Sequence, residues 1–167
     1  MTETRMTNNS FRYMWHNASS DGVKQLGHCR TLVVGIGKSG TNTVTRLMEM
    51  EATGAEYVAI SNDAAHLKAS KANEKVLIRK RIIKVPRNGS AVNLGKAAVE
   101  KSREYIESIL QGADIVFITA GFSGSIEMGG ALSIAEIAKQ RGAVTIGVVA
   151  TPLSFDKDGI GHVDIAT

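Results

Sequence analysis

Residues 31–42 have the sequence TLVVGIGKSGTN, and the prediction of the fold rests first on these residues. Residues 31–37 form a short, continuous apolar run that ends in glycines, which is typical of a β-strand buried on both faces. Residues 42–50 follow with apolar side chains at helical spacing and therefore predict a helix. A buried strand that passes through a glycine-rich turn into a helix is the first half of a βαβ unit, so the stretch indicates a parallel sheet.

The alternation of apolar strands and amphipathic helices continues along the chain. Strands are predicted at 57–61, 114–120 and 144–149, with a more polar edge strand at 76–83, and helices at 93–110 and 131–141. The strand at 144–149, VTIGVV, is almost wholly apolar, so we expect it to be buried. We therefore predict a doubly wound α/β fold: a mostly parallel sheet with helices on both faces, in which ligands bind at the carboxyl ends of the strands.

Length and composition favour a single domain in a reducing compartment. The 167 residues are 43% hydrophobic and 22% charged, which suits one core. Residues 1–28 are polar and lack periodicity, so we expect a flexible N-terminal extension followed by one domain over 29–167. The lone Cys29 cannot form an internal disulfide, and neither a membrane-spanning run nor a signal core is present. These features predict a cytoplasmic protein without direct membrane insertion.

Basic residues are concentrated between residues 68 and 87. Eight Lys or Arg and one Glu give this segment a formal charge of +7 (eight minus one), although the whole chain carries only +4. The segment lacks the interleaved aromatic residues that stack on bases. It therefore predicts a solvated basic edge, and no nucleic-acid partner is expected.

Two glycine-rich segments, 35–42 and 121–130, each follow a predicted strand at the same edge of the sheet. Glycine permits positive φ and a close approach of the backbone to a ligand, and the free amides at the start of the next helix favour an anion. Lys38 adds a positive charge and Asn42 a hydrogen-bonding side chain. The two segments together predict a site for a polyphosphate.

The first segment also fits a different ligand. Its spacing Gly35-x-Gly37-x-x-Gly40 satisfies the dinucleotide fingerprint, with Asp63 or Glu56 as the acidic residue for the ribose. An NAD-binding Rossmann domain is therefore an alternative. Asp63 has two open interpretations, as the cap of the following helix or as a group near a nucleotide.

The chain resembles the FtsZ/tubulin family in four stretches that occur in the same order. These are VVGIGKSGTNTVTRL (33–47), AISNDAAHL (59–67), GADIVFITAG (112–121) and AEIAKQRGAVTIGVVATPLSFD (135–156). This family hydrolyses GTP between subunits stacked head to tail in a filament, which serves cell division or cell shape. The resemblance implies the fold of its GTPase domain, with GTP or GDP and Mg²⁺ as ligands.

The resemblance also implies which residues contact the nucleotide. The α and β phosphates would be lined by Gly37, Lys38, Ser39, Gly40, Thr41 and Asn42. Gly89, between Asn88 and Ser90, would lie near the terminal phosphate. The second loop, which begins at Gly121, would contribute Gly124, Ser125 and Gly129 of the family's signature loop, and Asp156 stands where the family has a Glu for the ribose.

The signature loop departs from the family's pattern. Residues 123–129 are SGSIEMG where the family has Gly-Gly-Gly-Thr-Gly-Thr-Gly, so both threonine hydroxyls are missing. Glu127 would place a carboxylate beside bound phosphate, at a cost on the order of a few kcal/mol unless a metal or Lys38 compensates. Ile160 replaces the family's ribose-contacting Arg. The sequence stops at Thr167, before the family's central helix and catalytic loop, so we expect a half-site that is incomplete at its C-terminus.

Three functions follow. The first is a GTP-binding domain of an FtsZ-like cytoskeletal protein, with hydrolysis impaired or dependent on a partner, which joins itself or a full-length FtsZ-like protein in a head-to-tail filament. The second is an FtsZ-like interaction protein that binds no nucleotide, and the third is the NAD-binding domain. No catalytic residue and no metal-ligating cluster are predicted.

Overall fold

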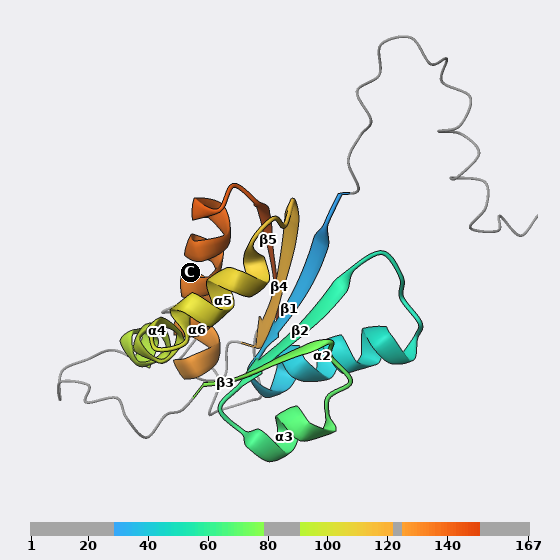
Figure 1. Cartoon of the computed structure of the whole chain (residues 1–167). Helices are drawn as coiled ribbons and strands as arrows, with labels where there is room; N and C mark the ends of the chain where they lie inside the picture. Colours follow the sequence, from blue (N-terminus) through green and yellow to red (C-terminus); the bar gives the residue numbers. More distant parts are fainter. Residues whose placement is uncertain (1–28, 79–90, 122–124, 151–167) are drawn as a thin grey trace, which may run out of the picture.

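Residues 29–78, 91–121 and 125–150 are described by the computed structural model of the chain. Within them, five strands form one parallel sheet in the order β3-β2-β1-β4-β5 (Figure 1). The strands are β1 (Thr31–Ile36), β2 (Glu56–Ser61), β3 (Glu74–Leu77), β4 (Ile115–Gly121) and β5 (Val144–Ala150). The helices are α2 (Gly37–Glu49), α3 (Ala64–Ala69), α4 (Ala91–Glu100), α5 (Arg103–Leu110) and α6 (Ser125–Gln140). The predicted doubly wound α/β fold is confirmed.

The strand order reverses beside β1. From β1 the chain passes through α2 to β2 and through α3 to β3, and it later returns to pair β4 with the opposite side of β1. Ile36 at the end of β1 lies opposite Ala120 near the end of β4. The carboxyl ends of β1 and β4 therefore flank the switch point at which doubly wound folds bind ligands.

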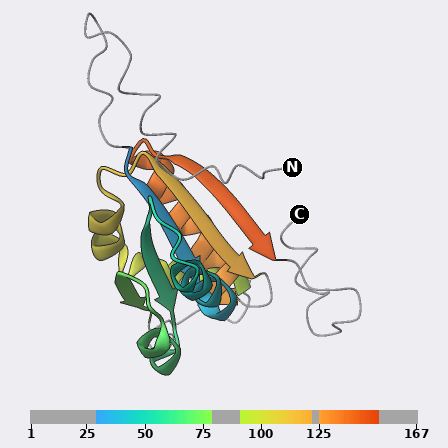
Figure 2. The ribbon, with the colours of Figure 1, turned by 90° about the vertical axis from the view of Figure 1, so that its right-hand side faces the viewer.

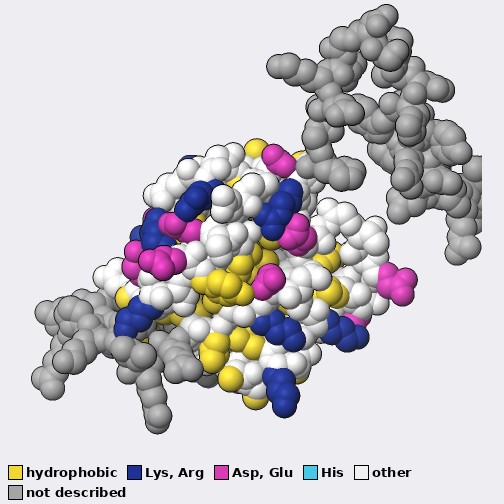
Figure 3. Space-filling model, viewed as in Figure 1, with side chains coloured by type: hydrophobic (Ala, Val, Ile, Leu, Met, Phe, Trp, Pro, Cys, Tyr) yellow, Lys and Arg dark blue, Asp and Glu magenta, His cyan; other side chains and the backbone are white. Residues whose placement is uncertain are grey.

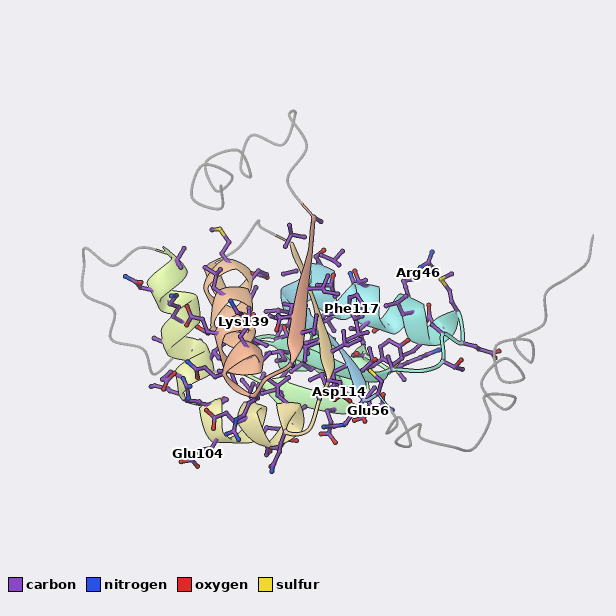
Figure 4. All side chains as sticks on the ribbon, turned by 90° about the horizontal axis from the view of Figure 1, so that it is seen from above. Arg46, Glu56, Glu104, Asp114, Phe117 and Lys139 are labelled. Atoms are coloured by element: carbon purple, nitrogen blue, oxygen red, sulfur yellow. The ribbon has the colours of Figure 1, made fainter. Side chains whose placement is uncertain are left out.

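The helices cover both faces of the sheet. Helices α4, α5 and α6 pack on one face and α2 on the other, as the view from above shows (Figure 4). The larger core lies under α4, α5 and α6 and includes the fully buried side chains of Ile36, Val99, Leu110, Ile134 and Ile137. A smaller core on the other face contains Val44, Tyr57, Ala59, Leu67 and Ala72.

Strand β5 is exposed, so the prediction that this strand is buried was wrong. Val144, Ile146 and Val148, which point to one face, are 60%, 40% and 54% exposed. Figure 2 shows β5 at the edge of the sheet on this face, without any helix of the described chain in front of it. An apolar run shows that a strand is suited to burial, but burial also requires an element that covers each face, and no described element covers this face of β5.

Both glycine-rich segments are more helical than predicted. Helix α2 begins at Gly37 rather than at Asn42, and α6 begins at Ser125 rather than at Ala131. Glycine disfavours helix on propensity alone, but tertiary contacts override this preference. The predicted residues 37–42, Ser125 and Gly129 therefore lie within α2 and α6 rather than in loops before these helices.

Two other predicted boundaries were also wrong. The helix predicted over 93–110 is divided into α4 and α5 at Lys101 and Ser102, where the backbone of Ser102 leaves helical geometry. The strand predicted over 76–83 begins earlier, at Glu74, and pairs with β2 at the edge of the sheet. The part of that prediction from residue 79 onward lies outside the described residues.

Charges of both signs are distributed over the surface. On the face in Figure 3, basic and acidic side chains are interspersed. From the predicted basic edge, Lys68, Lys71 and Lys75 are exposed, and its other basic residues lie outside the described ranges. No helix in the described ranges is long and apolar enough to cross a membrane.

Arg30 joins three segments at the amino end of the sheet. Its guanidinium forms two hydrogen bonds to the Glu56 carboxylate, 2.8 Å from Nε to Oε1 and 2.7 Å from Nη2 to Oε2. Nη1 donates to the carbonyl of Gln111 at 2.5 Å, and the backbone amide of Arg30 donates to Asp114 at 2.7 Å. Arg30 therefore fixes the start of β1 against β2 and against the turn before β4.

We expect Glu56→Gln to lower the free energy of unfolding by about 0.5–1 kcal/mol at neutral pH, a small effect because the pair is exposed and screened. The hydrogen bonds from Arg30 hold the pKa of Glu56 below its ordinary value. The stabilisation is thus complete above the ordinary Glu pKa of about 4.3 and is lost as the pH falls through the lower pKa of the folded state. Urea denaturation from pH 7 down to about pH 3 should show that the difference in unfolding free energy between the wild type and Glu56→Gln becomes smaller.

Glu51→Gln is the control, because the Glu51 side chain is exposed and forms no ion pair or hydrogen bond with the described residues. This variant should match the wild type at each pH. A Glu56→Gln deficit that stays constant down to the lowest pH would contradict a role for the Glu56 charge.

Candidate functional site at the switch point

The first turn of α2 presents backbone amides at the carboxyl end of β1. Gly37, the first helical residue, has a φ of +70°, which favours glycine. The N-cap, Ile36, has no side chain that can accept a hydrogen bond, and the first turn contains no acidic residue. The amides at the start of α2 therefore lack the side-chain acceptor that helices usually supply for themselves.

Helix α3 shows the contrast within the same protein. Asp63 caps α3, because its Oδ1 accepts hydrogen bonds from the amides of Ala65 and His66 at 2.9 and 3.1 Å. This favours the capping interpretation of Asp63. Glu56, the other acidic residue considered for a dinucleotide ribose, is the first residue of β2 and pairs with Arg30 at the opposite edge of the sheet.

The backbone of α2 packs directly on the two central strands. A Cβ on Gly40 would overlap the carbonyl oxygen of Thr119 in β4, and a Cβ on Gly35 would overlap the Gly40 carbonyl and lie 2.8 Å from Cγ2 of Val44. Neither Gly35 nor Thr119 was among the residues predicted to line the phosphates of GTP. A glycine inside a strand is the signal that could have revealed such a close approach.

The start of α6 meets the start of α2. The atoms nearest to a Cβ on Gly37 would all belong to Glu127, including Cδ at 2.5 Å, so the carboxylate lies directly over the first residue of α2. Glu127 is half-buried and lies in the first turn of α6, where an acidic side chain interacts favourably with the helix dipole. The two glycine-rich segments thus converge, and a carboxylate lies between them.

The Glu127 carboxylate has no counter-charge among the described residues. Lys38 is exposed and forms no ion pair with it, and no other ion pair or hydrogen bond of Glu127 is recorded within the described ranges. Nor does any group of three or more His, Cys, Asp or Glu side chains there come close enough to hold a metal ion. A metal in this site would need ligands from outside the described chain, such as phosphate oxygens.

The predicted nucleotide contacts occupy different environments. Lys38, Ser39 and Asn42 are exposed on the first turns of α2, whereas Thr41 is 1% exposed and its Oγ1 has no hydrogen-bond partner in the described part. Gly121 is the last residue of β4 and Ser125 the first of α6. Three further predicted contacts, Gly89, Gly124 and Asp156, lie outside the described residues.

Gly129 has a packing role in the contact between two helices. A Cβ there would overlap the carbonyl oxygen of Val92 and lie 2.8 Å from both Cα of Gly95 and the amide nitrogen of Lys96. Helices α4 and α6 therefore touch backbone to backbone at this glycine. The position is constrained by helix packing whether or not it also contacts a ligand.

Comparisons with known proteins agree with this architecture. The sequence profile of the family described as "Tubulin/FtsZ family, GTPase domain" matches residues 30–162. The chain is 39% identical over 133 residues to "Cell division protein FtsZ 2" of Methanocaldococcus jannaschii, a match that covers 80% of this chain and 35% of that protein.

Solved structures give the same result. A mutant FtsZ from M. jannaschii superimposes with a TM-score of 0.71 at 36% identity, over 83% of this chain and 43% of the other. An empty FtsZ dimer from M. jannaschii superimposes with a TM-score of 0.71 at 31% identity, over 96% of this chain and 46% of the other. The chain therefore spans less than half of the length of these relatives.

Proposed function

Because this chain belongs to the tubulin/FtsZ family, we propose that it binds a guanine nucleotide, GTP or GDP, with its phosphates against the first turns of α2 and α6. The observation that carries the proposal is the convergence of two helix N-termini at the switch point, where α2 has neither a side-chain cap nor an acidic first-turn residue. The choice of guanine rests on the family, since no described residue is assigned to the base, and Asp156, predicted for the ribose of GTP, lies outside the described ranges.

Equilibrium binding tests this proposal. Titration calorimetry with Mg²⁺ present should give roughly micromolar dissociation constants for GTP and GDP and no measurable binding of ATP or NAD⁺. Binding of NAD⁺ instead would favour the dinucleotide alternative, which is supported only by the Gly35-x-Gly37-x-x-Gly40 spacing. Absence of binding by every ligand would reject the proposal.

Lys38→Glu should weaken GTP binding by at least about tenfold, because it replaces a positive charge in the first turn of α2 with a negative one. Lys38 is exposed, so the fold should tolerate the change. Lys139→Glu is the control: Lys139 is also exposed but lies in the last turn of α6, far along the helix from the proposed site. Equal affinities of the two variants would place the phosphates elsewhere.

We further propose that hydrolysis is impaired or depends on a partner. Support comes from the signature loop, which lacks both threonine hydroxyls, and from the carboxylate that Glu127 places at Gly37. The proposed partner is another copy or a longer FtsZ-like protein in a head-to-tail filament, because the relatives include an FtsZ dimer. Sedimentation with and without GTP would test this assembly.

The Glu127 carboxylate also favours a second candidate function. A carboxylate over Gly37 opposes an anion there, which suits an FtsZ-like protein that interacts with a filament without binding nucleotide. Failure to bind GTP together with co-sedimentation with an FtsZ-like filament would support this second candidate.

A further inference from the structure

The position of Glu127 creates an electrostatic problem for the proposed nucleotide. Its carboxylate lies over Gly37, the residue whose neighbours in α2 would donate their amides to phosphate. A phosphate in contact with the first turn of α2 would therefore lie within a few ångströms of a second anion. Like charges at such a distance repel strongly wherever solvent is partly excluded, and Glu127 is half-buried.

The described chain does not supply a compensating charge. Lys38 forms no ion pair with Glu127, and the nearby Lys96 is paired with Glu136 at 3.4 Å. No cluster of metal-ligating side chains exists in the described ranges that would hold a cation before the nucleotide arrives. Since none of the described residues supplies this positive charge, a cation bound with the ligand would compensate the carboxylate.

We propose that Glu127 makes nucleotide binding by this chain conditional on a divalent cation held between its carboxylate and the phosphates. This inference rests on the proposed function. One carboxylate together with phosphate oxygens and water is a typical ligand set for Mg²⁺, which rarely has an all-protein cage. Glu127 would then act as a specificity-determining residue that rejects the metal-free nucleotide and accepts the nucleotide–metal complex.

Calorimetric titration of the full chain with GDP, in EDTA and in excess MgCl₂, tests the proposal without relying on hydrolysis. The wild type should bind GDP at least about 30-fold more tightly with Mg²⁺. Glu127→Gln keeps the shape and removes the charge, so it should bind in EDTA and change by less than about threefold when Mg²⁺ is added.

Glu136→Gln is the matched control. Glu136 is on the same helix and its removal changes the net charge equally, but it is exposed and pairs with Lys96. This variant should keep the Mg²⁺ dependence of the wild type. Circular dichroism of all three proteins would establish that each is folded.

The outcomes separate this inference from the proposed function. Tight binding of GDP by the wild type in EDTA overturns the role of Glu127 and leaves the nucleotide site intact. A gain in affinity of Glu127→Gln that is equal in EDTA and in Mg²⁺ also overturns it, because the carboxylate would then only compete with phosphate. Failure of all three proteins to bind under both conditions rejects the proposed function itself.

Discussion

Gly40→Ala is expected to lower the free energy of unfolding by about 3 kcal/mol or more, which is a large part of the stability of a domain of this size. A Cβ at this position would overlap the carbonyl oxygen of Thr119 and lie 2.9 Å from the carbonyl carbon of Gly35. Both atoms belong to the backbone of central strands, so they cannot move aside as a flexible side chain can. The gain in helix propensity, about 1 kcal/mol, is too small to offset this overlap.

Urea denaturation monitored by circular dichroism would measure the effect, with Gly147→Ala as the control. Gly147 lies in exposed β5, and a Cβ there would have no atom within 4 Å. Its replacement should change stability by no more than about 0.5 kcal/mol. If Gly40→Ala were as stable as Gly147→Ala, α2 could not lie as close to β1 and β4 as described.

Two neighbouring glycines of α6 are expected to respond to alanine with opposite signs. Gly129→Ala should destabilise the fold by about 2–4 kcal/mol, because the methyl group would force α4 away from α6 at Val92 and Gly95. Gly130→Ala should be neutral or stabilise by up to about 1 kcal/mol, since its Cβ would lie at ordinary distances, 3.4 Å from Val99 and 3.5 Å from Ile36.

Thermal and urea denaturation of both variants would test this pair. Each substitution adds the same methyl group to the same helix, so helix propensity cancels in the comparison. The difference between the variants reports the packing of α4 on α6. Equal stabilities, or a less stable Gly130→Ala, would contradict the backbone contact at Gly129.

The sequence predicted the sheet well because buried parallel strands are continuous apolar runs. Strand β1 was expected over 31–37 and spans Thr31–Ile36, and β4 was expected over 114–120 and spans Ile115–Gly121. Burial of β5 could not be predicted in the same way. Side chains such as Ile146 favour burial, but only the packing of the rest of the molecule decides whether another element covers them.

Parts of the site also depended on contacts that are not local in sequence. The glycine-rich segments predicted two convergent anion-binding turns; Glu127 of the second segment lies against Gly37 of the first, and anion binding there stays a prediction. The partner of Gly129 in helix packing could not be identified from the sequence, because Val92 lies on another helix. The sequence also left the role of Asp63 open. In the structure its carboxylate accepts two hydrogen bonds from amides of α3, which favours the role of a helix cap.

Nitrogen–proton correlation NMR of the labelled chain, titrated with GDP and Mg²⁺, tests the proposed phosphate position most directly. We expect the largest shifts at the amides of Lys38, Ser39 and Glu127, at the carboxyl end of the sheet. Gly112 and Gly142, which precede β4 and β5 at the opposite edge, should not shift. Shifts centred on those two glycines, or no shift in any amide, would contradict a phosphate site between α2 and α6.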